Sequence, residues 1–99
     1  MPVVLTQDLP VPVDMLSQVS KEMGVAEDPP EGLIVHVIVP RGETSRVIDI
    51  WESQAHFERF REDRLEPAIN KVMQTVGAAP PENMPEPTFD EAVDLVRGR

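Results

Sequence analysis

Apolar and polar residues divide the chain into patterned segments that are separated by prolines and glycines. The run from Val3 to Leu9 is bounded by prolines and predicts a short first strand. After it, apolar residues recur at three- and four-residue spacing up to Gly24, which is typical of an amphipathic helix. We expect Asp14 to cap that helix and Gly24 to end it.

Two β-rich runs occupy the middle of the chain. The strongest strand signal covers Leu33–Val39, and a second arm of β-branched and apolar residues covers Arg46–Trp51. The residues between them, Arg41–Thr44, supply a turn. We therefore expect an antiparallel hairpin.

A second helix is expected directly after the hairpin. Ser53 is a good N-cap residue, and Phe57 continues an apolar stripe along the segment that follows. Pro67 lacks an N–H group and restricts the residue before it, so it predicts a kink or a break and a second piece from about residue 68 to 76. Gly77 then ends the helix.

The last segment, Thr88–Val96, follows a proline-rich linker from Pro80 to Pro87 and is ambiguous. Thr88 and Glu91 have the spacing of a capping box, whereas strand alternation fits the same residues. We favour a strand, because the order then becomes βαββαβ, the ferredoxin-like unit. The expected fold is α+β: one domain over residues 1–99, with a four-stranded antiparallel sheet and two helices on one face.

The central hairpin is apolar on both faces, although two helices can cover only one of them. Because side chains alternate along a strand, Leu33, Val35 and Val37 should point one way, and Ile34, His36 and Ile38 the other. An antiparallel strand with one wet face would instead alternate apolar and polar residues. We therefore expect a homodimer formed through the open sheet face, with a ligand on that face as the competing explanation.

Composition narrows the chemistry. The 99 residues contain 18 acidic and nine basic side chains, a net charge of −9, which argues against nucleic-acid and anionic-membrane partners. With no cysteine and two histidines, we expect no disulfides, no thiolate nucleophile and no metal site. No segment is long and apolar enough to span a bilayer and no signal peptide is evident, so we expect a cytoplasmic protein.

Two sequence runs resemble a known family. Gly32-Leu33-Ile34-Val35-His36-Val37, and the run Val47-Ile48-Asp49-Ile50-Trp51-Glu52-Ser53 followed by Phe57 and Phe60, are similar to the dimeric α+β barrel superfamily, closest to its antibiotic-biosynthesis-monooxygenase-like proteins. The resemblance is best over residues 32–70. It implies a homodimer whose two sheets form a barrel with an interior able to hold an organic ligand or haem. Family activities include cofactor-independent quinone-forming oxygenation, haem degradation and isomerisation, so the fold does not determine the reaction.

Candidate catalytic residues lie in the hairpin. His36, between Ile34 and Ile38, is either a hydrogen-bonded core histidine or an acid–base group facing a bound phenol or quinone. Asp49, on the neighbouring strand, needs a partner if it is buried, and His36 is the expected one. Ile34 and Ile38 are the expected ligand-binding neighbours of His36. Trp51 either packs in the core or interface or, as the resemblance implies, forms an aromatic wall of the pocket.

Other charged groups have simpler interpretations. His56, early in the second helix, is expected to be a partly exposed residue without a role. Arg59, Arg61 and Arg64 alternate with acidic residues, which indicates either solvated helix pairs or a cationic rim for an acidic aromatic substrate. The haem-degrading relatives have an axial histidine in this helix, and residues 59–64 contain none; Gln7 also stands where those relatives have a pocket asparagine.

Three functions follow, of which the first two have about equal support and the third has the least. The first is a homodimer that binds a small apolar or aromatic molecule and acts as a cofactor-free monooxygenase-like enzyme. The second is a non-catalytic dimer module with a packed interior, and haem binding is the third. An interior cavity of roughly 300 Å³ or more would favour ligand binding over the module.

Overall fold

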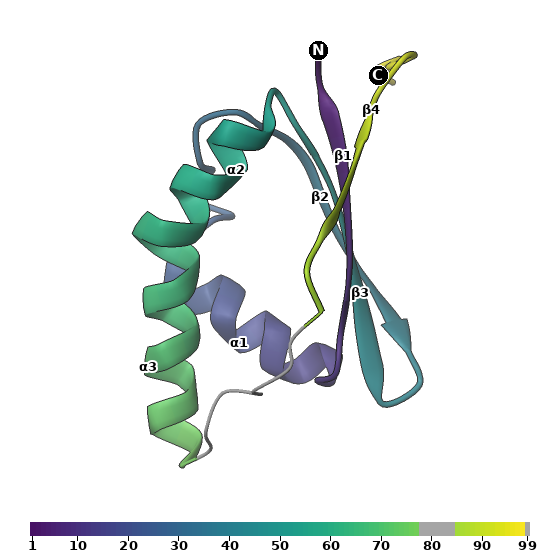
Figure 1. Cartoon of the computed structure of the whole chain (residues 1–99). Helices are drawn as coiled ribbons and strands as arrows, with labels where there is room; N and C mark the ends of the chain where they lie inside the picture. Colours follow the sequence, from purple (N-terminus) through teal and green to yellow (C-terminus); the bar gives the residue numbers. More distant parts are fainter. Residues whose placement is uncertain (78–84, 99) are drawn as a thin grey trace.

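The computed structural model describes residues 1–77 and 85–98. Its strands and helices follow the expected βαββαβ order (Figure 1). The elements are β1 (Val3–Leu9), α1 (Val13–Met23), β2 (Leu33–Arg41), β3 (Thr44–Trp51), α2 (Gln54–Phe60), the π-helical segment η1 (Arg61–Leu65), α3 (Glu66–Val76) and β4 (Thr88–Glu91). The α+β, ferredoxin-like fold class is confirmed.

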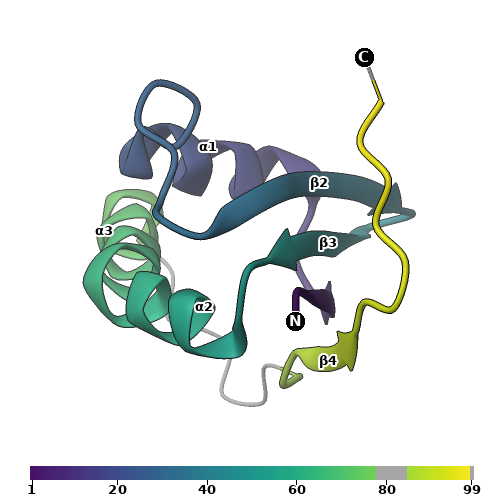
Figure 2. The ribbon, with the colours of Figure 1, turned by 90° about the horizontal axis from the view of Figure 1, so that it is seen from above.

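The four strands form one antiparallel sheet in the order β2-β3-β1-β4. All the helices lie on one side of this sheet, and the segment after β4 leaves on the other side (Figures 1 and 2). Buried apolar residues make two small core clusters, one around Leu5, Trp51 and Phe57 and the other, between α1 and α3, around Val19, Ala68 and Val72. Leu65 packs against both clusters.

The C-terminal segment is a strand, as predicted, but a shorter one. Its four residues pair with β1, and Phe89 stands opposite Leu5. Pairing stops at Glu91 because β1 itself begins at Val3. One more hydrogen bond between the two segments, from the N–H of Ala92 to the carbonyl of Pro2 at 2.9 Å, lies just beyond the paired residues. Residues 92–96 therefore do not continue the strand. Of the predicted linker, residues 80–84 lie outside the described part of the chain.

The helix ends agree with the sequence at three points and differ at one. Gly24 and Gly77 end α1 and α3 in the left-handed conformation, and Ser53 caps α2 by accepting the N–H of His56. The cap expected at Asp14 is wrong, because α1 begins at Val13 and Pro12 is its N-cap residue. Asp14 instead lies in the first turn, where a carboxylate interacts favourably with the helix dipole.

Pro67 does not break the second helix. The chain stays helical from α2 through η1 into α3, and Pro67 lies in the first turn of α3. Within η1 the backbone N–H of Glu66 bonds to the carbonyl of Arg61, a wider turn than that of an α-helix. The hydrogen-bond spacing of the helix thus changes just before Pro67. Proline has no backbone N–H, so a regular α-helix would be missing one hydrogen bond at this position.

A β-bulge alters which residues of β2 share a face. The register pairs Leu33 with Trp51 and Val35 with Ile50, so an extra residue is accommodated between them. Leu33 therefore joins His36 and Ile38 on the helix-facing side, contrary to the simple alternation expected from the sequence. The open side, here called the outer face, carries three cross-strand rows: Val4, Ile50 and Val35; Thr6, Ile48 and Val37; Asp8, Arg46 and Val39.

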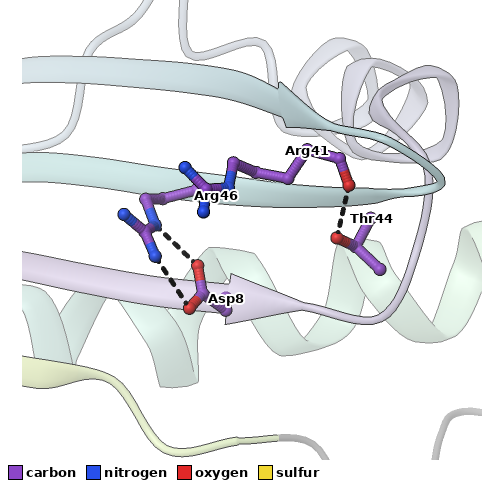
Figure 3. Close-up of polar contacts among 4 residues, drawn as sticks. All are labelled: Asp8, Arg41, Thr44 and Arg46. Carbon is purple, nitrogen blue, oxygen red and sulfur yellow. Dashed lines mark hydrogen bonds and ion pairs between the residues drawn. The ribbon is translucent and has the colours of Figure 1, made fainter.

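The end of the β2–β3 hairpin is held by polar contacts (Figure 3). The hydroxyl of Thr44 donates to the carbonyl of Arg41 at 2.8 Å, and the guanidinium of Arg46 donates twice to the carboxylate of Asp8, at 2.7 and 3.2 Å. The hydrogen bond from Arg46 holds the pKa of Asp8 below its usual value. This ion pair ties β3 to β1 at one end of the outer face.

Candidate functional site

A cavity of about 240 Å³ lies between the sheet and the helices. Its walls come from the helix-facing sides of β1, β2 and β3, from α1, from the helix running through α2, η1 and α3, and from residues 85–87. Apolar side chains form most of the lining, and the small number of polar groups includes His36, Asp49, Gln7 and Arg61. An apolar enclosure with a few polar groups is the usual form of a small-molecule site.

The predicted pair of His36 and Asp49 is present in this lining. The two residues stand directly opposite each other on β2 and β3, and His36 Nδ1 lies 2.7 Å from Asp49 Oδ1. The side chain of Asp49 is 6% exposed and that of His36 is 33% exposed. The pair therefore joins a buried carboxylate to a histidine that solvent can reach.

Asp49 also binds Trp51. The indole Nε1–H donates to the second carboxylate oxygen, Oδ2, at 3.2 Å. Trp51 is buried and packs edge-on against Phe57, with 5.7 Å between ring centroids, while it also lines the cavity. The two interpretations of Trp51, core packing and cavity wall, thus hold together.

The contact with Asp49 affects both the pKa and the tautomer of His36. The hydrogen bond to Asp49 raises the pKa of His36, while partial burial opposes this effect. Because a carboxylate only accepts hydrogen bonds, Nδ1 carries a proton and donates it to Asp49. In the neutral ring Nε2 then has the free lone pair and can accept a proton from a molecule in the cavity.

Only one of the two isoleucines predicted as ligand-binding neighbours of His36 lines the cavity. Ile38 lines the cavity, whereas Ile34 does not, because the bulge between Leu33 and Val35 breaks the alternation on which that prediction rested. The cavity also lies within one chain, on the helix-facing side of the sheet. The resemblance implied a ligand space inside a barrel of two sheets, and the predicted site residues do not face that side.

The lining includes residues that the sequence analysis did not name as site residues. Gln7 faces the cavity from β1, and its amide Nε2–H donates to the carbonyl of Pro85 at 2.9 Å. Its place between Leu5 and Leu9, at alternate positions of the first strand, was the available signal. The three methionines that line the cavity, Met15, Met23 and Met73, come from α1 and α3 and carried no such signal.

His56 has a structural position that the sequence did not suggest. Its Nδ1 lies 2.7 Å from the hydroxyl of Ser53, and its ring packs on Gly32, where an added Cβ would come within 2.5 Å of the ring. His56 does not line the cavity. Through these contacts with Ser53 and Gly32, His56 packs the start of α2 against the segment that leads into β2.

The described residues show neither a metal-binding cluster nor a membrane-spanning helix. Residues 1–77 and 85–98 contain no group of three or more histidine, cysteine, aspartate or glutamate side chains that could hold a metal ion. In the same residues no helix has the length and apolar character needed to cross a membrane.

Comparisons with known proteins support the fold. No protein-family model matches the chain, and no curated protein sequence matches it either. Among solved structures, SnoaB from Streptomyces nogalater, described as a cofactor-independent oxygenase, is 11% identical with a TM-score of 0.61 and 96% of each chain covered. Rv0793 from Mycobacterium tuberculosis is 14% identical with a TM-score of 0.61, covering 98% of this chain and 100% of its own.

A third solved structure supports the same fold. A protein from Deinococcus radiodurans, described as a "putative antibiotic biosynthesis monooxygenase", is 12% identical with a TM-score of 0.62, covering 98% of this chain and 97% of its own. Identities this low carry information about the fold and not about the reaction. The resemblance expected from the sequence is therefore confirmed at the level of architecture: this chain has the fold of the antibiotic-biosynthesis-monooxygenase-like proteins.

Proposed function

We propose that the chain binds a small, flat, mainly apolar aromatic molecule in the cavity and removes an acidic proton from it, as a cofactor-free oxygenase-like enzyme. The observation that carries this proposal is the His36–Asp49 pair, 2.7 Å apart, on the wall of an apolar cavity. SnoaB, which has the same fold, is described as a cofactor-independent oxygenase, and this supports the choice of reaction class.

The chemistry needs only the residues present and molecular oxygen. Nε2 of His36 accepts the proton of a phenol, and the Asp49 carboxylate stabilises the resulting imidazolium through Nδ1. The phenolate is the species that reacts with oxygen, and for a fused-ring phenol one molecule of O₂ gives a quinone and water. The protein contributes deprotonation, orientation and exclusion of water.

We would test this with 1-naphthol, a fused-ring phenol, in air-saturated buffer containing a chelator. Wild-type protein should consume oxygen and form 1,4-naphthoquinone, measured with an oxygen electrode and by absorbance. H36Q should abolish the rate and D49N should lower it by at least tenfold, since general-base catalysis contributes about 10²–10⁴-fold. H56Q is the matched control, because His56 lies outside the cavity lining, and it should retain the wild-type rate. A rate unchanged in H36Q would contradict the proposal.

A non-catalytic module is the second candidate, and one observation favours it. The cavity of about 240 Å³ is smaller than the roughly 300–1,000 Å³ of typical ligand pockets. The methionines that line it are adaptable side chains that can fill irregular space. This candidate predicts no binding of 1-naphthol and no oxygen uptake.

Haem is not a ligand that these residues fit. A macrocycle of that size exceeds the cavity, and residues 59–64 contain no histidine at the place where haem-degrading relatives have their axial ligand. His36 has one ring nitrogen engaged with Asp49. We therefore derive no step through haem.

We also propose that two copies associate through the outer face. Val35 and Val37 on this face are 43% and 41% exposed, and the helices cover only the opposite side of the sheet (Figure 2). Pairing two such faces would remove this apolar surface from water, which is the main driving force for protein association.

A further inference from the structure

Arg61 brings a positive charge to the wall of the cavity. It is the first residue of η1, its side chain lines the cavity, and its guanidinium carbon lies 5.5 Å from the centre of the Phe57 ring. Arg59 and Arg64 are not in the lining. The positive charge at the cavity therefore comes from one position of this arginine-rich helix.

The guanidinium of Arg61 is held loosely. Its nearest carboxylate oxygens belong to Glu58, at 3.9 Å, and to Glu86, at 3.8 Å, and both distances are too long for hydrogen bonds. The carboxylate of Glu86 is 87% exposed, so water screens its attraction.

The other two paired arginines are engaged firmly. Arg46 donates twice to Asp8, and Arg64 donates to the carbonyl of Met23 at 2.7 Å. Within the described residues, the guanidinium of Arg61 forms no hydrogen bond of this kind. Its N–H groups are therefore available to a ligand.

Arg61 and His36 lie toward opposite edges of the sheet. His36 is on the edge strand β2, whereas Glu86, the partner of Arg61, lies two residues before the other edge strand, β4. The two edge strands are three strand spacings of about 4.8 Å apart, and a ligand of two fused rings is shorter than that span. A flat ligand with an anionic group at Arg61 would therefore extend toward His36 and cover part of the distance.

We propose that Arg61 is a specificity residue that selects aromatic ligands carrying a carboxylate or a similar anionic oxygen. This inference rests on the proposed function, because it assumes that the cavity is a ligand site. Guanidinium binds a carboxylate through two parallel hydrogen bonds, which loosely paired glutamates at 3.8 and 3.9 Å do not provide. An incoming carboxylate would replace them with better geometry in a less polar setting.

Three carboxylates line the cavity, and one of them, Asp49, is buried and bonded to His36 and Trp51. The other two act against an anionic ligand. Glu66 and Glu86 both contribute to the walls, and both residues are exposed to solvent. Their repulsion is therefore screened by water, while Arg61 interacts with the ligand at contact distance. The selection for an anion should be moderate in size, about tenfold, and not absolute.

The test compares naphthalene-2-carboxylate with naphthalene-2-carboxamide, an isosteric neutral probe. Trp51 is the only tryptophan and lines the cavity, so the one indole N–H signal in a ¹H–¹⁵N spectrum reports on binding without any need for turnover. Wild-type protein should bind the carboxylate about tenfold more tightly than the carboxamide. R61M should remove this preference by weakening the binding of the carboxylate while leaving the binding of the carboxamide unchanged. R61K should retain part of the preference, because lysine keeps the positive charge but lacks the planar guanidinium that binds a carboxylate through two hydrogen bonds.

R59M is the matched control, because Arg59 lies on the same helix and outside the cavity lining. It should keep the wild-type preference. Equal binding of the two probes by wild type, or a preference that survives in R61M, would overturn the role of Arg61 and leave the ligand site standing. If neither probe moves the Trp51 signal, the cavity is not a site for such molecules, and the proposed function fails together with this inference.

Discussion

Asp49 is the residue on which the polar part of the site depends. A buried carboxylate is unfavourable unless hydrogen bonds replace its hydration. Here both oxygens are used, one by His36 at 2.7 Å and the other by the indole of Trp51 at 3.2 Å. No buried side-chain nitrogen or oxygen in the described part of the chain is left without a partner. The carboxylate therefore orients two cavity-lining rings at once.

Replacing Asp49 with asparagine should lower the pKa of His36. The hydrogen bond to the carboxylate is the main cause of the raised pKa, and burial, which acts in the opposite direction, would remain. NMR titration of the His36 ring protons measures the effect. D8N, on the outer face, should leave the titration unchanged. An unaltered His36 titration in D49N would show that the carboxylate does not control this histidine.

The same pair predicts how stability depends on pH. The folded-state pKa of His36 is raised above its ordinary value of 6.5, so the folded protein holds this proton more tightly than the unfolded chain. The stabilising contribution is complete below about pH 6.5 and is lost as pH rises through the folded-state pKa. Urea unfolding of wild type and H36Q between pH 5 and pH 8 should show a wild-type advantage that shrinks as pH rises. A difference independent of pH would argue against this linkage.

At the scale of elements, two irregularities place the site residues. The bulge in β2 moves Leu33 to the same side as His36, and the π-helical turn keeps the long helix continuous up to Pro67. Gly32 begins the path into β2, and its φ of +88° is one that residues with a side chain rarely adopt. The approach of His56 to this glycine then fixes how closely α2 lies to the hairpin.

G32A should destabilise the fold more than G42A does. Both glycines have positive φ, but an added Cβ at Gly32 would meet the His56 ring at 2.5 Å, whereas at Gly42 nothing lies within 4 Å. We expect a loss of about 1 kcal/mol from G42A through backbone strain alone. G32A should lose a further 1–3 kcal/mol, roughly, because the ring of His56 must move. Denaturant unfolding of the two variants measures the difference, and equal losses would mean that the contact with His56 is unimportant.

At the scale of the whole molecule, the chain has one covered and one uncovered sheet face. The covered face encloses the cavity, and the first two rows of the outer face consist of valine and isoleucine side chains together with Thr6. The ion pair of Asp8 and Arg46 closes the third row (Figure 3). A contiguous apolar surface of this kind is typical of an interaction site.

V37D should convert a dimer into a monomer. Val37 lies in the middle row of the outer face and is 41% exposed, so an aspartate is tolerated in a single chain but would be buried without a partner in a dimer. Light scattering should give twice the 11.1 kDa chain mass for wild type and the single-chain mass for V37D. V76D introduces the same charge at an exposed valine in α3 and should remain dimeric. A monomeric wild type would refute the proposed assembly.

The order of elements could be predicted because each carries a local signal. Alternating β-branched residues, Ser53 as a cap, and Gly24 and Gly77 as helix ends depend only on neighbours in sequence. The pairing of His36 with Asp49 could also be predicted, because the two residues lie on the two strands of one hairpin and a buried carboxylate requires a hydrogen-bond donor. The short last strand was settled by the known βαββαβ unit and not by its own residues.

The remaining features depend on contacts between residues far apart in sequence. The exclusion of Ile34 from the cavity follows from a bulge whose position is determined by pairing with β3, and the entry of Arg61 and Gln7 follows from how the helices pack over the sheet. The sequence by itself thus determined the elements and the contact between His36 and Asp49, because these arise from local propensities and from the cost of burying charge. Only the tertiary structure decided that this pair faces the helices, because the side to which a strand presents its residues is set by register and packing.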